Sequence, residues 1–140
     1  MRVLIVDDSV VMRSIVENAL RQSEGESTEI LHASNGLDAL GVIQSDSVKA
    51  HPLDLILCDV HMPKMNGLEF LLEKRRNNLA PDVPTVMITA DASDPQVLRA
   101  LAEGAQGYIS KPFTLEQIKS RLASLLLTKV SPLGLGDALT

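Results

Sequence analysis

Residues 53–67 read Leu-Asp-Leu-Ile-Leu-Cys-Asp-Val-His-Met-Pro-Lys-Met-Asn-Gly. The apolar run at residues 55–58 is typical of a strand that is covered on both faces of a parallel sheet. The run ends at Asp59, and Pro63 cannot continue strand pairing because proline has no N–H to donate. Asn66-Gly67 then predicts a turn before a helix. This stretch therefore displays a carboxylate at the carboxyl end of a strand, where open α/β sheets place their ligands.

The composition limits the function classes. A chain of 140 residues with 45% hydrophobic content suits one folded domain. The net charge of −5 argues against direct nucleic-acid binding, and 2% aromatic residues provide no stacking platform for bases or a flavin. The single cysteine, Cys58, excludes an internal disulfide; we expect an inert buried thiol, which suits the cytoplasm. The apolar run at residues 3–6 is too short for a signal peptide or a membrane insertion.

Short apolar runs alternate with helical patterns along the chain. Strands are predicted at residues 3–6, 28–33, 55–58, 85–89 and 107–110. Each is followed by a helix, and capping or turn residues predict the helix starts: Ser9, Ser34-Asn35-Gly36, Asn66-Gly67, Ser93-Asp94-Pro95 and Thr114 with Gln117. The apolar stripe of the first helix is predicted from its spacing: Val11, Met12, Ile15, Val16, Ala19 and Leu20. Residues 46–52 are predicted to form a polar loop.

This alternation predicts a doubly wound α/β fold, in which helices cover both faces of a five-stranded parallel sheet. Two strand orders are common, and a chain of this size favours the flavodoxin-like order 2-1-3-4-5, although periodicity alone does not fix the order. The domain is predicted to span residues 1–128. Residues 129–140, with two glycines, one proline and no helical stripe, are expected to form a flexible tail or linker.

Polar side chains follow the predicted strands at the edge where parallel strands end. The first strand delivers Asp7 and Asp8, the third Asp59, the fourth Thr89 and the fifth Lys111. Crowded carboxylates repel unless a cation joins them, and an all-oxygen site suits Mg²⁺. A hydroxyl, an ammonium and Mg²⁺ around a carboxylate form a clamp for phosphoryl oxygens. The constellation therefore points to phosphoryl transfer, with an aspartate as a possible nucleophile.

Several motifs occur in order at these strand ends: Asp7-Asp8, Asp-x-x-Met-Pro-x-Met-x-Gly from Asp59, Thr89-Ala90 and Lys111-Pro112. Together they resemble the receiver domain of two-component response regulators, and the single-domain chemotaxis type is the most similar in build. The resemblance covers residues 2–127. One such motif is weakly specific, whereas the full set in this order is highly specific.

The resemblance implies that Asp59 accepts a phosphoryl group from a sensor histidine kinase or a phosphotransfer protein. It implies a signalling domain rather than an enzyme, with only self-catalysed phosphotransfer and slow autodephosphorylation. Asp8 and Asp59 would ligate Mg²⁺, Asp7 would act partly through water, and the backbone carbonyl of His61 would be a further ligand. Lys111 would pair with the new charge.

The resemblance also implies a switch and an output surface. Thr89 would move to bond the phosphoryl group and Tyr108 would follow inward, while His61 and Asp91 occupy positions that tune the phosphoryl lifetime in the family. A downstream target protein is expected on the face of the fourth helix, fifth strand and fifth helix. The turn that returns Lys111 over the site predicts a cis peptide bond before Pro112.

Other function classes fit less well. A dehalogenase-superfamily phosphatase needs a second aspartate two residues after the nucleophile, followed by a threonine, and this chain has His61 and Pro63 there. A flavodoxin-like carrier needs a phosphate loop and aromatic residues. A receiver-like module that is never phosphorylated usually lacks a key residue, and none is missing here. The chain is either a stand-alone regulator or a receiver excised from a larger one.

Overall fold

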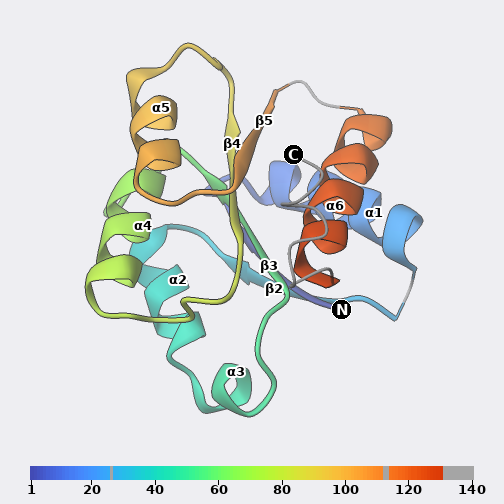
Figure 1. The fold of residues 1–140 in the computed structure, drawn as a ribbon, viewed down its shortest axis with the longest axis horizontal. Helices are drawn as coiled ribbons and strands as arrows, with labels where there is room; N and C mark the ends of the chain where they lie inside the picture. The colour runs from blue at the N-terminus through green and yellow to red at the C-terminus, as the bar shows by residue number, and fades with distance from the viewer. Residues whose placement is uncertain (26, 112–113, 131–140) are drawn as a thin grey trace.

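The computed structural model describes residues 1–25, 27–111 and 114–130. Its centre is a 5-stranded parallel sheet in the order β2-β1-β3-β4-β5 (Figure 1). The strands are β1 (Arg2–Val6), β2 (Glu29–Ala33), β3 (Leu55–Asp59), β4 (Thr85–Thr89) and β5 (Gly107–Ser110). The fold class and strand order predicted from the sequence are therefore confirmed.

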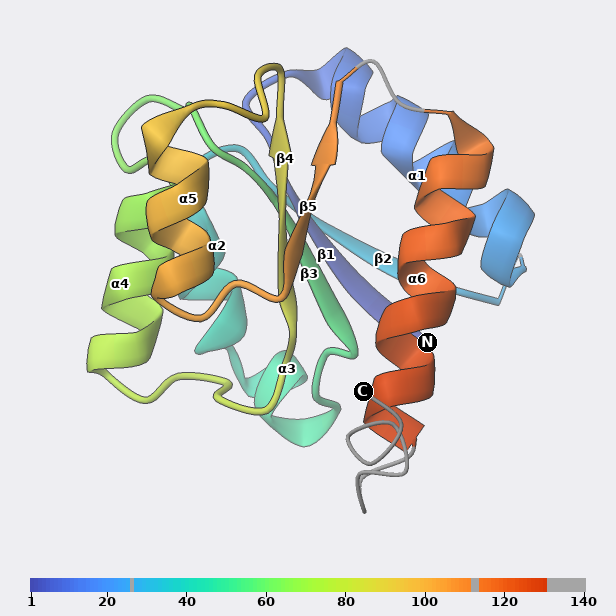
Figure 2. The same cartoon turned by 45° about the horizontal axis from the view of Figure 1, so that its top comes forward.

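Helices cover both faces of this sheet. They are α1 (Val10–Glu24), α2 (Gly36–Ile43), α3 (Asp46–Ala50), α4 (Gly67–Arg76), α5 (Pro95–Ala102) and α6 (Leu115–Val130). Figures 1 and 2 show α1 and α6 on one side of the sheet, and α2, α4 and α5 on the other. Within the described residues, no helix combines the length and apolar composition that crossing a membrane requires.

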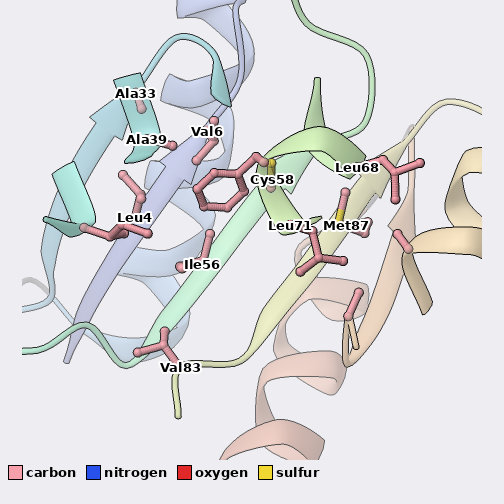
Figure 3. Close-up of a cluster of buried hydrophobic side chains, with 14 of the residues drawn as sticks. Leu4, Val6, Ala33, Ala39, Ile56, Cys58, Leu68, Leu71, Val83 and Met87 are labelled. Carbon is pink, nitrogen blue, oxygen red and sulfur yellow. The ribbon is translucent and has the colours of Figure 1, made fainter. Parts of the chain in front are cut away.

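The core is divided by the sheet into two apolar clusters, because successive strand residues point to opposite faces. Figure 3 shows the cluster on the side of α2 and α4, where strand side chains meet Leu68 and Leu71 of α4. Its strand members include Leu4, Val6, Ile56, Cys58 and Met87. Alternate residues face α1 and α6, among them Val3, Ile5, Leu57 and Ile88. Burial on both faces explains the unbroken apolar runs of the central strands.

The residues predicted to begin the helices cap them with their side chains. The Ser9 hydroxyl accepts a hydrogen bond from the Met12 backbone N–H at 3.1 Å. At the start of α4, Asn66 and Glu69 form a reciprocal capping box at 2.8 and 3.0 Å. Thr114 and Gln117 do the same before α6, at 2.8 and 3.1 Å. These bonds satisfy N–H groups that have no partner within the helix and fix where each loop leaves the sheet.

The prediction of a polar loop at residues 46–52 is wrong for its first part, because α3 forms there. The Ser45 hydroxyl caps this short helix by accepting from the Val48 N–H at 3.3 Å. Val48 is only 4% exposed and anchors the helix to the core. One apolar residue among polar ones gave no periodic signal, so the local cap and the tertiary contact together decide the structure.

The apolar stripe predicted for α1 is only partly buried. Val16 and Leu20 are 1% and 0% exposed, whereas Val11 and Ile15 are 70% and 48% exposed. The stripe predicted from spacing holds two adjacent residues per turn, which is wider than the surface that the sheet and α6 cover. The first turns of α1 therefore present apolar side chains at the molecular surface.

Some predictions fall outside the described residues. The predicted cis bond involves Pro112, and the predicted tail includes residues 131–140, all of which lie outside them. Helix α6 extends to Val130. The boundary between domain and tail at residue 128 thus stays a prediction.

Gly67 is expected to be indispensable for the close approach of α4 to the end of β3. An added Cβ would lie 2.3 Å from the Asp59 carbonyl oxygen and 2.7 Å from the Met87 methyl. Gly67→Ala should therefore lower the free energy of unfolding by about 1–3 kcal/mol, as overpacking does. Chemical denaturation measures this.

The matched control is Gly41→Ala in α2, where an added Cβ meets nothing within 4 Å. Alanine should stabilise that helix position by about 0.5–1 kcal/mol. Equal effects of the two substitutions would contradict the steric account of Gly67.

Candidate functional site

Three carboxylates meet at the carboxyl edge of the sheet. Asp7 and Asp8 follow β1, and Asp59 ends the neighbouring strand β3. One carboxylate oxygen from each of the three lies within 4.8 Å of those of the others. Asp7 is buried and Asp8 is exposed, so the cluster opens toward solvent on one side. The sequence prediction that these acids converge is thus correct.

Lys111, directly after β5, brings a positive charge to the cluster. Its Nζ lies 3.4 Å from Asp7 Oδ2 and 3.4 Å from Asp59 Oδ1. Both contacts span residues far apart in sequence and depend on the strand order. One ammonium among three carboxylates leaves the pocket with a net negative charge, which favours a bound cation.

The surroundings of Asp59 disfavour the negative charge of its carboxylate. Burial raises the pKa of its carboxyl above the ordinary value, and the nearby Asp7 charge raises it further. Lys111 and the Val60 backbone N–H partly offset this pKa shift. The Val60 N–H donates to Oδ1 at 3.0 Å, and among the described residues no group donates to Oδ2. Asp59 therefore has one oxygen fixed and one available for chemistry.

Asp7 and Asp8 differ in how they are held. Asp7 Oδ1 accepts from the Ser9 N–H at 2.9 Å, and its Oδ2 faces Lys111. Arg13 donates to the Asp7 backbone carbonyl at 2.5 Å, a support that the sequence analysis missed. The exposed Asp8 carboxylate has no hydrogen-bond partner among the described residues. Asp7 is consequently a fixed neighbour, whereas Asp8 can turn toward a ligand.

Thr89 lies at the same edge, but its hydroxyl is engaged in the following loop. Thr89 Oγ1 donates to the Asp91 carbonyl at 2.9 Å and accepts from the Asp91 N–H at 3.0 Å. Thr89 is 2% exposed. In this state the hydroxyl does not bond Asp59, so any bond to a group on Asp59 requires it to leave Asp91.

Tyr108 lies on the edge strand β5, opposite Met87 in the strand register. It is half-buried and packs against the apolar cluster on the α4 side. Tyr108 therefore lies two positions before Ser110 on β5, next to β4, and Ser110 is the residue that pairs with Thr89 in the strand register.

The His61 side chain points to a partner outside the acidic cluster. Its Nε2 lies 2.5 Å from Asp94 Oδ2, the cap residue of α5. The Gln96 N–H and then His61 lower the pKa of Asp94. Asp91 is exposed, and its hydrogen bonds from Ser93 lower its pKa. The contact between His61 and Asp94 joins the loop after β3 to α5, and no local sequence signal could have revealed it.

Cys58 precedes Asp59 and is fully buried within the sheet. Burial raises the pKa of its thiol, and the charges of Asp59 and Asp7 raise it further. A thiol in this environment stays protonated and unreactive at neutral pH, in agreement with the prediction.

Comparison with known proteins agrees with this geometry. Residues 3–123 match the family model of the response regulator receiver domain. A chemotaxis protein CheY homologue of Campylobacter jejuni is 34% identical over 128 residues, which cover 91% of this chain and 94% of that protein. Chemotaxis protein CheY-3 of Vibrio cholerae is 38% identical over 122 residues, covering 87% and 88% of the two chains.

A solved structure of a similar protein has the same fold. The structure of chemotaxis protein CheY4 of Vibrio cholerae superposes with a TM-score of 0.74 at 31% identity, covering 89% of this chain and 97% of that chain. The match of sequence, strand order and acidic edge shows that this chain belongs to the response regulator receiver domain family.

Proposed function

We propose that this receiver domain takes a phosphoryl group onto Asp59 from a phosphohistidine of a sensor histidine kinase or a phosphotransfer protein. The observation that carries the proposal is the cluster of Asp7, Asp8 and Asp59 carboxylate oxygens within 4.8 Å. Lys111 lies beside that cluster at 3.4 Å. The like charges repel one another, which raises the free energy of the unliganded site. Binding of a phosphoryl group together with a cation and the lysine offsets that repulsion.

Asp59 Oδ2 is the attacking atom, because Oδ1 is already held by the Val60 N–H. A lone pair of Oδ2 forms the new bond to phosphorus while the phosphorus–nitrogen bond of the donor breaks. The imidazole nitrogen keeps that electron pair and takes up a proton. The product is an acyl phosphate on Asp59 and a free histidine on the donor.

The acidic cluster fits a hard divalent cation, and we propose Mg²⁺. Asp8 and Asp59 would ligate it directly, Asp8 because it is exposed and Asp59 through Oδ1, which leaves Oδ2 for the attack on phosphorus. Both Asp7 oxygens already have partners, which supports an action through water. The backbone carbonyl of His61 is proposed as a further ligand from the family resemblance. When bound, Mg²⁺ supplies charge neutralisation at the phosphoryl oxygens.

Lys111 and Thr89 respond to the new charge. A phosphoryl group brings about two negative charges and three acceptor oxygens. The Lys111 ammonium already contacts Asp59 and pairs with it. The Thr89 hydroxyl gives up its two bonds to Asp91 and turns toward Asp59, and Tyr108 moves inward after it. The two arrangements are populations of one equilibrium, which phosphorylation shifts.

The signal leaves through the face formed by α5, β5 and α6. A groove of ≈ 540 Å³ runs between β5 and α6, and Tyr108, Gln117 and Arg121 are among its lining residues. Movement of Tyr108 therefore changes the shape of this groove. We propose that a downstream target protein binds this face and distinguishes the two states.

We propose that the chemistry stops at the phosphorylation of Asp59 and its slow hydrolysis, without turnover of a separate substrate. The family match gives no support to the dehalogenase-type phosphatase. The proposed location is the cytoplasm, where the buried thiol of Cys58 stays reduced.

Asp59→Asn is expected to abolish phosphorylation by acetyl phosphate and Mg²⁺, because the amide is not a nucleophile toward phosphorus. Intact-mass measurement detects the phosphoryl adduct. Asp82→Asn, at an exposed position that precedes β4 at the opposite edge, is the matched control and should be modified like wild type. An adduct of similar yield on Asp59→Asn would contradict the assignment of Asp59 as the phosphoryl acceptor.

Mg²⁺ should stabilise the folded protein by relieving repulsion among the acids. A ligand at ten times its Kd adds about 1.4 kcal/mol to the free energy of unfolding. Thermal melting with and without Mg²⁺ measures the effect in wild type, Asp8→Ala, Asp59→Asn and the Asp82→Asn control.

Asp8→Ala and Asp59→Asn should weaken the response to Mg²⁺, and Asp59→Asn should also raise the metal-free melting temperature. Asp82→Asn should respond like wild type. A wild-type melting temperature that ignores millimolar Mg²⁺ would rule out a metal site at these acids.

Thr89→Ala should leave phosphorylation of Asp59 largely intact and uncouple Tyr108 from it. NMR of the Tyr108 ring with and without beryllofluoride, a phosphoryl mimic, reports the coupling in the chain's only tyrosine. Thr89→Ser keeps the hydroxyl and should preserve the change in the ring environment. If the ring responds equally in wild type and Thr89→Ala, the switch does not run through Thr89.

A further inference from the structure

Arg13, near the start of α1, contacts the loop that carries the first two acids of the cluster. Its backbone N–H donates to the Ser9 carbonyl at 3.0 Å, and its side chain is half-buried. The Nη1 atom donates to the Asp7 carbonyl at 2.5 Å. Helical side chains tilt toward the amino end of their helix, so a residue of α1 can reach back to the preceding loop. Arg13 therefore joins α1 to the turn formed by Asp7 and Asp8.

The place of this guanidinium is unfavourable for α1 itself. It lies at the amino end of the helix, where the helix dipole disfavours a positive charge. The first turn of α1 contains no acidic residue that could compensate. Among the described residues, the Asp7 carbonyl is the only hydrogen-bond partner of the Arg13 side chain. The contact with the loop is consequently what this side chain provides.

This contact fixes the backbone that carries Asp8. The Asp7 carbonyl belongs to the planar peptide group between Asp7 and Asp8, so a bond to its oxygen sets the direction of that whole group. The Asp7 N–H donates to the Ala33 carbonyl at 3.1 Å, and the Ser9 N–H donates to Asp7 Oδ1 at 2.9 Å. Arg13 holds the peptide group that lies between these two bonds. The Asp8 carboxylate has no partner of its own among the described residues, so its direction depends on this backbone.

We propose that Arg13 is a positioning residue of the phosphoryl site, which holds the Asp7–Asp8 peptide so that the Asp8 carboxylate faces the cation site. The inference rests on the proposed function, in which Asp8 ligates Mg²⁺. A ligand that is fixed beforehand loses less conformational freedom when the cation binds. Hydrogen bonds that orient metal ligands raise metal affinity for the same reason. Arg13 acts through the backbone and contacts neither the cation nor the phosphoryl group.

Charge and positioning predict opposite effects of removing Arg13. Its guanidinium is a positive charge next to a cluster of three carboxylates. If charge were its whole contribution, its loss would make the site more negative and Mg²⁺ binding tighter. Loss of positioning makes Mg²⁺ binding weaker. The direction of the change in Mg²⁺ affinity therefore distinguishes the two roles.

The test is Mg²⁺ titration of wild type and Arg13→Met in the full chain. NMR follows the backbone amide of Val60, which donates to Asp59 Oδ1. Methionine keeps an unbranched side chain and removes the guanidinium, and Mg²⁺ affinity should fall by about tenfold or more. Arg13→Lys keeps the charge and a donor on a shorter side chain, and it should weaken binding less than Arg13→Met.

A second measurement needs no metal. The Asp8 amide N–H belongs to the peptide group that Arg13 holds, so its NMR order parameter reports the freedom of that group. In metal-free Arg13→Met this order parameter should fall below the wild-type value, because the bond to the Asp7 carbonyl is gone.

Arg21→Met is the matched control on the same helix. Arg21 Nη1 donates to the Thr28 carbonyl at 2.7 Å, before β2 and away from the acidic edge. This variant therefore loses the same charge and the same kind of bond. It should destabilise the fold, as chemical denaturation measures, and leave both the Mg²⁺ affinity and the Asp8 order parameter at their wild-type values.

Unchanged or tighter Mg²⁺ binding by Arg13→Met would overturn the proposal, and so would an equal loss of affinity in Arg21→Met. An Asp8 order parameter that stays at the wild-type value in Arg13→Met would overturn it as well. Failure of the proposed function looks different, because wild type itself would then show no saturable response to Mg²⁺ at Val60. That result would remove the metal site and the role of Arg13 together.

Discussion

The crowding of carboxylates against one ammonium at a single edge of the sheet is the constraint on which the rest of the site depends. Parallel pairing of β1 with β3 brings Asp7 and Asp59 together, and pairing through β4 and β5 brings in Lys111. The close approach of Gly67 to the Asp59 carbonyl holds α4 against this edge. The site therefore requires this strand order as well as the acids themselves.

The sequence was sufficient for the features that depend on local patterns. Apolar runs marked the strands, and Ser9, Asn66 and Thr114 marked helix starts because a cap needs only residues within one turn. The convergence of Asp7, Asp8 and Asp59 followed from topology, since parallel strands end at the same edge. Helix α3 was missed because its burial depends on the single residue Val48.

Features that depend on side-chain direction or distant partners could not be predicted. The Thr89 hydroxyl turns to Asp91, and no pattern in the sequence distinguishes that direction from one toward Asp59. The contact of His61 with Asp94 joins residues 33 positions apart. Lys74 is only 7% exposed because it follows Phe70 and Leu71 on the buried side of α4, and no sequence pattern marked it. Each of these features needs the packed tertiary structure.

The central claim is that Asp59 becomes an acyl phosphate. The most direct measurement identifies the residue that carries the phosphoryl group. The protein is incubated with phosphoramidate and Mg²⁺, since phosphoramidate offers the same phosphorus–nitrogen bond as phosphohistidine. Borohydride then reduces an acyl phosphate to an alcohol, and peptide mass spectrometry locates it. The account predicts homoserine at position 59 alone. Homoserine at Asp7, Asp8 or Asp91, or a phosphoryl group retained on His61, would contradict it.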